Sequence, residues 1–140
     1  MSTHNDRRPR VLVVDDDATI RRLTSYALQK AGFEVLEAST ADEGVKHVAE
    51  EEPNLDAVVT DVEMPGELNG YDLAWYAHSG CPEAVLFVVS SSVGEDRQDL
   101  PPHGRFFEKP IDPRILIAEL RDALILAQRT PASLTTAGLA

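Results

Sequence analysis

The chain has 140 residues, enough for one domain with a useful core, and a hydrophobic fraction of 43%, which is ordinary for a globular protein. Its formal net charge of −11 argues against direct contact with nucleic acid, because phosphate backbones select basic surfaces. The single cysteine, Cys81, excludes an internal disulfide framework and a cysteine-based zinc site. No apolar stretch approaches the roughly 20 residues of a membrane helix. Residues 1–10 hold no apolar signal core, so we expect a cytoplasmic protein.

Five short apolar runs predict β-strands, and they alternate along the chain with helical patterns. In chain order, strands are expected at residues 11–14, 33–38, 55–60, 84–89 and 105–108. The first and fourth runs are continuously apolar rather than alternating, which is typical of strands buried on both faces. In the helix after the first strand, Ile20, Leu23 and Leu28 share one face and are expected to point into the core.

Capping residues mark the starts of the other helices. Thr40 begins the second helix, and Glu43 three residues later makes a capping-box pattern. Asn69 opens the third helix, and Asp112 opens the last. Between the fourth and fifth strands, glycines and prolines interrupt the helix signal, so residues 92–103 are expected to hold at most a short helical turn.

Strands that alternate with helices predict right-handed β-α-β units. The expected fold is therefore α/β, with a doubly wound five-stranded parallel sheet covered on both faces. We expect the folded domain to span residues 10–127. Residues 1–9 should form a flexible N-terminal arm, and residues 128–140 should form a flexible C-terminal tail that is too short and too polar to fold.

Polar side chains follow four of the predicted strands. They are Asp15 and Asp16 after the first, Asp61 after the third, Ser90 after the fourth and Lys109 after the fifth. Each residue alone is typical of a turn or a helix cap. In a parallel sheet, however, functional groups gather at the carboxyl ends of the strands, so these side chains are expected to meet in one cleft.

Three carboxylates in one cleft repel one another, by about 4 kcal/mol for a pair 4 Å apart at an effective dielectric near 20. A divalent cation with oxygen ligands, such as Mg²⁺, would offset this repulsion, and Lys109 supplies a second positive charge. This combination suits phosphoryl transfer onto a carboxylate. We assign Asp61 as the acceptor because it stands alone at its strand end, whereas adjacent Asp15 and Asp16 suit metal binding.

Four motifs together resemble a known family. They are Val-Leu-Val-Val-Asp-Asp-Asp at 11–17, Asp-Val-Glu-Met-Pro-Gly at 61–66, Val-Val-Ser at 88–90 and Phe-Phe-Glu-Lys-Pro at 106–110. Over about residues 10–127 the chain resembles the receiver domain of response regulators in bacterial two-component systems. The resemblance implies a flavodoxin-like receiver fold with strand order 2-1-3-4-5.

The resemblance also implies a site chemistry. Asp61 would take a phosphoryl group from a phosphohistidine on a sensor histidine kinase or histidine phosphotransfer protein. Asp16 would bind Mg²⁺ directly, Asp15 would help directly or through water, and Asp61 and the backbone carbonyl of Glu63 would complete the ligands. The chain would then be a signalling receiver rather than an enzyme, catalysing only its own phosphorylation and dephosphorylation.

Receivers switch through two further positions, which are Ser90 and Phe106 here. Ser90 and Lys109 would contact the phosphoryl oxygens, Phe106 would turn inward, and the bond between Lys109 and Pro110 would be cis. The switched surface would bind a downstream protein target, without direct nucleic-acid contact or membrane insertion. The loop at 64–70 is one residue longer than usual, a form that looks like stand-alone or hybrid-kinase receivers. The fourth helix is expected to be shortened or irregular, and no effector domain is expected to follow.

Two other interpretations remain open. Asp15-x-Asp17-x-Thr19 after an apolar strand is similar to the nucleophile motif of haloacid-dehalogenase-like phosphatases, with Asp15 as the nucleophile. That family's later acidic motif and its cap domain have no counterpart in this sequence. The other alternative is a pseudo-receiver, a binding module that has the fold but is not phosphorylated.

Overall fold

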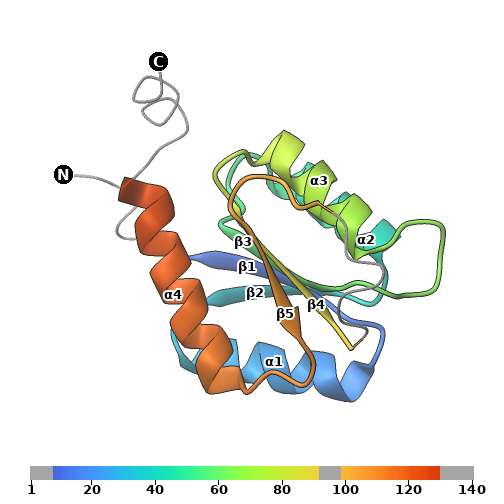
Figure 1. The fold of residues 1–140 in the computed structure, drawn as a ribbon, viewed down its shortest axis with the longest axis horizontal. Coiled ribbons are helices and arrows are strands. Elements are labelled where there is room, and N and C mark those ends of the chain that lie inside the picture. The colour runs from blue at the N-terminus through green and yellow to red at the C-terminus, as the bar shows by residue number, and fades with distance from the viewer. Residues whose placement is uncertain (1–7, 92–98, 130–140) are drawn as a thin grey trace.

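The computed structural model describes residues 8–91 and 99–129. In these ranges, helices and strands follow one another as the sequence predicts (Figure 1). The strands are β1 (Arg10–Val14), β2 (Glu34–Ala38), β3 (Ala57–Asp61), β4 (Val85–Ser90) and β5 (Gly104–Glu108). The helices are α1 (Ala18–Lys30), α2 (Ala41–Glu51), α3 (Gly70–Gly80) and α4 (Pro113–Arg129).

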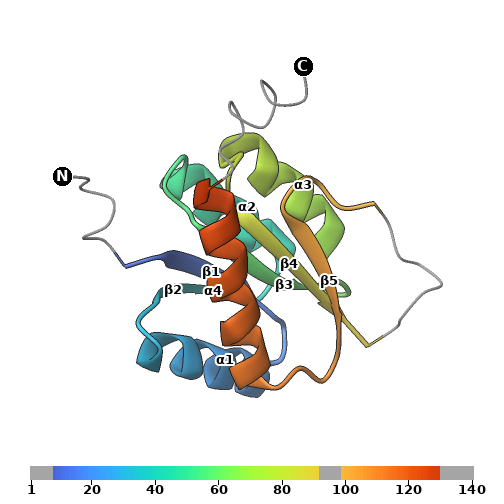
Figure 2. The ribbon, with the colours of Figure 1, turned by 60° about the vertical axis from the view of Figure 1, so that its left-hand side comes forward.

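The five strands form one parallel sheet with the order β2-β1-β3-β4-β5. Helices α1 and α4 cover one face of this sheet, and α2 and α3 cover the other (Figures 1 and 2). The predicted doubly wound α/β fold and its strand order are therefore confirmed. The point where strand order reverses lies between β1 and β3, where such folds place their ligands.

The core consists of two apolar layers, one on each side of the sheet. Leu12 and Val14 point into the layer under α2 and α3, whereas Val11 and Val13 point into the layer under α1 and α4. Strand β4 alternates in the same way between the two layers. This double burial explains why these strands read as unbroken apolar runs.

Side chains cap the helix starts, and the caps predicted at Thr40 and Asn69 are confirmed with one difference in detail. The side chain of Asp17 caps α1 by accepting from the Ile20 N–H at 3.1 Å. Thr40 caps α2, but Glu43 accepts from the backbone N–H of the preceding Ser39 instead of that of Thr40. The full reciprocal capping box occurs at α3, between Asn69 and Asp72.

The prediction for the buried face of α1 was partly wrong. Leu28 is buried, but Ile20 is exposed and Leu23 is 62% exposed. The inward positions, spaced three or four residues apart, also include Arg21, Thr24 and Ser25. Because polar side chains take positions that hydrophobicity would assign to the core, the apolar pattern misplaced the buried face.

The segment between β4 and β5 is only partly described, because residues 92–98 lie outside the described ranges. Residues 99–103 hold a turn and no helix. The prediction of at most a short helical turn at 92–103 thus stays untested for most of its length. Among the described residues, no helix is both long and apolar enough to span a bilayer.

Candidate functional site

Three carboxylates meet at the carboxyl edge of the sheet. Asp15 directly follows β1, Asp16 is the next residue, and Asp61 is the last residue of β3. Each contributes an oxygen that lies within 4.8 Å of those from the other two. The sequence places Asp61 just after the strand, whereas the structure includes it in β3, where it pairs with Val89. The strand backbone therefore fixes the position of this carboxylate.

Lys109 brings the positive charge into this cluster. Its Nζ lies 3.1 Å from Asp61 Oδ2 and 3.4 Å from Asp15 Oδ2. Lys109 follows β5, and its backbone N–H donates to the Ser90 carbonyl at 2.9 Å. The bond between Lys109 and Pro110 is cis, as the family resemblance implies, and a second cis bond joins Glu52 to Pro53. The fold thus brings the Lys109 ammonium group to carboxylates that lie far from it in the sequence.

The protonation of the central pair follows from burial and mutual contact. Burial raises the pKa of Asp61, and the nearby charge of Asp15 adds to the effect, although the Lys109 ammonium opposes both. Burial alone would lower the pKa of Lys109, but the hydrogen bond and charge of Asp61 outweigh it, so this pKa is raised. Lys109 therefore stays charged at neutral pH, beside a carboxylate that is more basic than usual.

Asp15 is the most constrained of the three carboxylates. Its side chain is buried, and Oδ1 accepts from the Asp17 N–H at 2.9 Å. Its own backbone N–H donates to the Ala38 carbonyl on β2 at 3.1 Å. Asp16, in contrast, is exposed at the mouth of the site. A small cavity of about 40 Å³ lies beside Asp15, Asp61 and Lys109, with α1 and α4 forming its other walls.

The remaining predicted site residues lie around this cluster. Ser90 ends β4, is buried, and pairs with Glu108 on β5. Phe106 lies on β5, is partly buried, and packs against the core layer under α2 and α3. Glu63 is exposed, two residues after Asp61. The roles assigned to these residues stay predictions.

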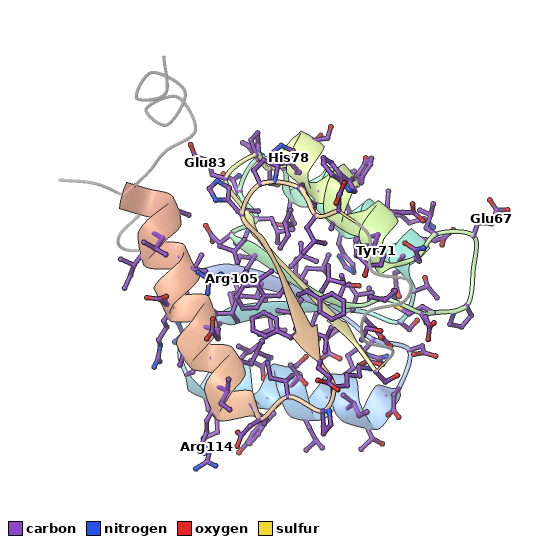
Figure 3. All side chains as sticks on the ribbon, in the orientation of Figure 1. Glu67, Tyr71, His78, Glu83, Arg105 and Arg114 are labelled. Atoms are coloured by element: carbon purple, nitrogen blue, oxygen red, sulfur yellow. The ribbon has the colours of Figure 1, made fainter. Side chains whose placement is uncertain are left out.

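The loop between β3 and α3 is long and anchored at both ends. Met64 and Leu68 pack against the core, and the Leu68 N–H donates to Asp42 at 3.4 Å. Gly66 adopts a φ of +112°, which favours glycine. Figure 3 shows Glu67 at the outer end of this loop, pointing away from the sheet. The loop therefore extends outward from the sheet around Glu67.

Two residues that matter to the site were not singled out by the sequence. Gly70 begins α3, where its N–H donates to the Val62 carbonyl at 2.9 Å. A Cβ on Gly70 would lie 2.1 Å from the carbonyl oxygen of Asp61. Arg21 turns inward from α1 and donates to the Asp15 carbonyl. The sequence held only a weak signal for each residue: Gly70 is a glycine at a predicted helix start, and Arg21 is a charged residue close to the apolar positions of its helix.

The donor set fits a hard divalent cation. Three carboxylates that converge within 4.8 Å supply the oxygen ligands that Mg²⁺ prefers, and the exposed side of the cluster leaves room for water ligands. A single lysine does not neutralise three carboxylates, so a bound cation would relieve the remaining repulsion. The residues present therefore fit a hard divalent cation such as Mg²⁺, beside a carboxylate whose pKa is raised.

The fold and the site together define a class of protein, namely flavodoxin-like α/β domains with an acidic metal-competent site at the carboxyl edge of the sheet. The sequence also matches the model of the response regulator receiver domain over residues 11–121. The chain therefore belongs to the response regulator receiver family.

Individual relatives agree with this assignment. The chain is 28% identical over 123 residues to the CAI-1 autoinducer sensor kinase/phosphatase CqsS of Vibrio cholerae, covering 77% of this chain and 16% of the kinase. It is 29% identical to the receiver protein CpdR of Brucella abortus over 84% of this chain and 98% of CpdR. It spans about half the length (49% to 54%) of several curated transcriptional regulators.

Solved structures show the same fold. The receiver domain of the hybrid histidine kinase CckA superimposes with a TM-score of 0.72 at 28% identity, covering 82% of this chain and 98% of that domain. The chain is thus similar both to stand-alone receivers and to receivers within larger kinases.

Proposed function

We propose that this protein is a phosphoacceptor receiver in a two-component phosphorelay of the cytoplasm, with Asp61 as the acceptor. One observation carries the proposal: Asp61 Oδ2 lies 3.1 Å from Lys109 Nζ, inside a cluster of three carboxylates. The pKa of Asp61 is raised, which makes it a better nucleophile than a solvated aspartate, and the lysine can stabilise charge on the incoming group.

In the proposed reaction, an oxygen of the Asp61 carboxylate attacks the phosphorus of a phosphohistidine. A new O–P bond forms and the P–N bond breaks, while the leaving imidazole nitrogen keeps the electron pair and takes a proton from solvent. Lys109 and Ser90 would hold the phosphoryl oxygens as the group arrives. A bound Mg²⁺, on Asp15, Asp16, Asp61 and the Glu63 carbonyl, would neutralise charge on the phosphoryl group.

Two observations favour Asp61 over Asp15 as the acceptor. Lys109 contacts both carboxylates, but Asp15 Oδ1 also accepts from the Asp17 N–H, whereas burial raises the pKa of Asp61 and so makes its carboxylate a stronger nucleophile. Asp15 is therefore better suited to hold a metal than to attack a phosphorus atom. The same argument counts against the phosphatase alternative, in which Asp15 is the nucleophile.

The output of the proposed receiver is a change in protein binding. Ser90 and Phe106 lie on neighbouring strands, so movement of one toward a phosphoryl group could be followed by repacking of the other. The partners would be a sensor histidine kinase or histidine phosphotransfer protein upstream, and a protein target downstream. Attack of water on phospho-Asp61 would release phosphate and restore the carboxylate, so the protein would catalyse only its own phosphorylation and dephosphorylation.

Intact-mass analysis tests this proposal. The parent, Asp61→Asn and Asp15→Asn are incubated with Mg²⁺ and a small-molecule acyl phosphate. We expect the parent to gain one phosphoryl group, and Asp61→Asn to gain none. Labelling that persists in Asp61→Asn but disappears in Asp15→Asn, with turnover of a phosphate ester, would instead support the phosphatase. An unlabelled parent would support the pseudo-receiver.

A further inference from the structure

Arg21 is a charged residue at an inward position of α1. Its side chain is 17% exposed, and it makes two contacts there. One guanidinium nitrogen donates to the backbone carbonyl of Asp15 at 2.8 Å, and Nε donates to Glu37 on β2 at 3.0 Å. A mostly buried arginine needs such partners, because an unpaired charge is costly to desolvate. Arg21 therefore ties α1 to the ends of β1 and β2.

The carbonyl that Arg21 contacts lies just past the ladder of the sheet. The last paired residue of β1 is Val14, which pairs with Ala38 on one side and Thr60 on the other. Asp15 still donates its N–H to Ala38, but its carbonyl lies beyond the paired residues. The guanidinium thus supplies a hydrogen bond where the neighbouring strands no longer pair with β1.

This hydrogen bond constrains Asp16 as well. The peptide group is planar, so an interaction that holds the carbonyl oxygen of Asp15 also orients the N–H and Cα of Asp16. Asp16 is the exposed carboxylate of the acidic cluster, whereas Asp15 is buried and Asp61 is partly buried. The direction of its side chain therefore depends strongly on the peptide that precedes it.

We infer that Arg21 is a positioning residue for Mg²⁺, acting through the Asp15–Asp16 peptide, an inference that rests on the proposed function of the site. Groups that orient metal ligands commonly change metal affinity by 10–100-fold when removed. Glu37 compensates the positive charge of Arg21, so the guanidinium can orient the peptide with little repulsion of the cation. Arg21 would thus affect Mg²⁺ affinity in two opposite ways: by orienting the peptide it would raise the affinity, and by its positive charge it would lower it. A substitution that removes Arg21 shows which effect is larger.

The neighbouring Arg22 is a matched control. It carries the same charge, and its Nε lies 3.8 Å from the other oxygen of Glu37, but its side chain is 75% exposed. The only Arg22 contact that the structure gives is this ion pair with Glu37. Mg²⁺ is titrated calorimetrically into the parent, Arg21→Gln and Arg22→Gln, without a phosphodonor. We expect Mg²⁺ affinity to fall about tenfold in Arg21→Gln and to stay within about twofold of the parent in Arg22→Gln.

If Arg21 acted through charge alone, both variants would bind Mg²⁺ at least as tightly as the parent, and the inference would be overturned. At saturating Mg²⁺, Arg21→Gln should be labelled at nearly the parent's rate; a rate still about tenfold lower would also overturn it. Arg21→Lys keeps the charge but lacks the two-sided fork. Arg21→Lys should bind Mg²⁺ with an affinity between those of the parent and Arg21→Gln. If Arg21→Gln does not fold when EDTA removes the metal, the affinity of Arg21→Lys tests the inference in its place. A parent that binds no Mg²⁺ would refute the proposed function itself.

Discussion

Gly70 lies directly against the backbone of Asp61. A Cβ at position 70 would be 2.1 Å from the Asp61 carbonyl oxygen, far inside van der Waals contact. The start of α3 and the end of β3 therefore lie so close together that no side chain fits between them. This approach holds the two ends of the loop that carries Glu63 together, and so positions that loop relative to the Asp61 carboxylate.

Gly70→Ala should consequently disturb both stability and the site. We expect the free energy of unfolding to fall by about 1–3 kcal/mol, the usual cost of overpacking, since the new Cβ would collide with backbone atoms of Asp61 and Val62 that cannot move aside easily. Phosphorylation by a small-molecule donor should slow as Asp61 is displaced. Gly80→Ala is the control. There the new Cβ meets the movable end of the Glu52 side chain, so the free energy of unfolding, measured in urea, should fall much less. Equal effects from the two variants would contradict this reasoning.

The raised pKa of Asp61 predicts a pH-dependent stability. The folded state binds the Asp61 proton more tightly than the unfolded chain does. That stabilisation is complete below pH 3.8 and is lost as pH rises through the folded pKa. In Mg²⁺-free buffer at pH 7, Asp61→Asn should therefore be more stable than the parent, because the folded parent must bury a charged carboxylate there. This extra stability of Asp61→Asn should shrink as the pH falls through the folded pKa of Asp61 toward its ordinary value of 3.8.

Urea unfolding of the parent and Asp61→Asn at several pH values measures this difference. Lys109 does not contribute to the pH trend, because its pKa lies above its ordinary value of 10.5. A variant less stable than the parent at pH 7 would show that the Lys109 ion pair outweighs the cost of burying the carboxylate.

Mg²⁺ should stabilise the folded protein by mass action. At a Mg²⁺ concentration 100 times the dissociation constant, the gain is about 2.7 kcal/mol, provided that the unfolded chain does not bind the ion. Asp16→Asn should lose most of this gain. Asp17→Asn is a matched control, because asparagine caps a helix as well as aspartate does and Asp17 lies outside the three-carboxylate cluster. Thermal unfolding with MgCl₂ and with EDTA distinguishes the two.

The only tryptophan links α3 to the segment before β5. Its indole N–H donates to the Asp99 carbonyl at 3.1 Å. Trp75→Phe removes this hydrogen bond and should lower the free energy of unfolding by about 0.5–1.5 kcal/mol. Tyr76→Phe, at a neighbouring exposed position, should change it less. Amide exchange at Asp99, Leu100, His103 and Gly104 should accelerate only in Trp75→Phe; unchanged exchange at these residues would mean that the hydrogen bond does not hold this segment.

Much of the fold was predictable from the sequence, because strands that face a core layer on both sides need apolar residues at every position. The unbroken apolar runs at β1 and β4 predicted strands buried on both faces, and Asn69 and Asp112 predicted the starts of two helices. The convergence of Asp15, Asp16, Asp61 and Lys109 followed from a parallel sheet alone, since carboxyl ends share one edge.

Other features depended on tertiary contacts that hydrophobicity does not encode. Leu23 was expected in the core, but α1 turns Arg21 inward because the end of β1 offers a carbonyl to bind. The close approach at Gly70 leaves no trace in the sequence beyond a glycine at a helix start. The reach of Glu43 to Ser39 rather than Thr40 likewise depends on the local path of the chain.

The ion pair between Asp15 and Lys109 joins residues 94 positions apart in the sequence. A nascent or partly unfolded chain keeps these two groups far apart and does not assemble the cluster of three carboxylates. The proposed phosphorylation therefore requires the complete fold, and a damaged molecule is expected to be inert.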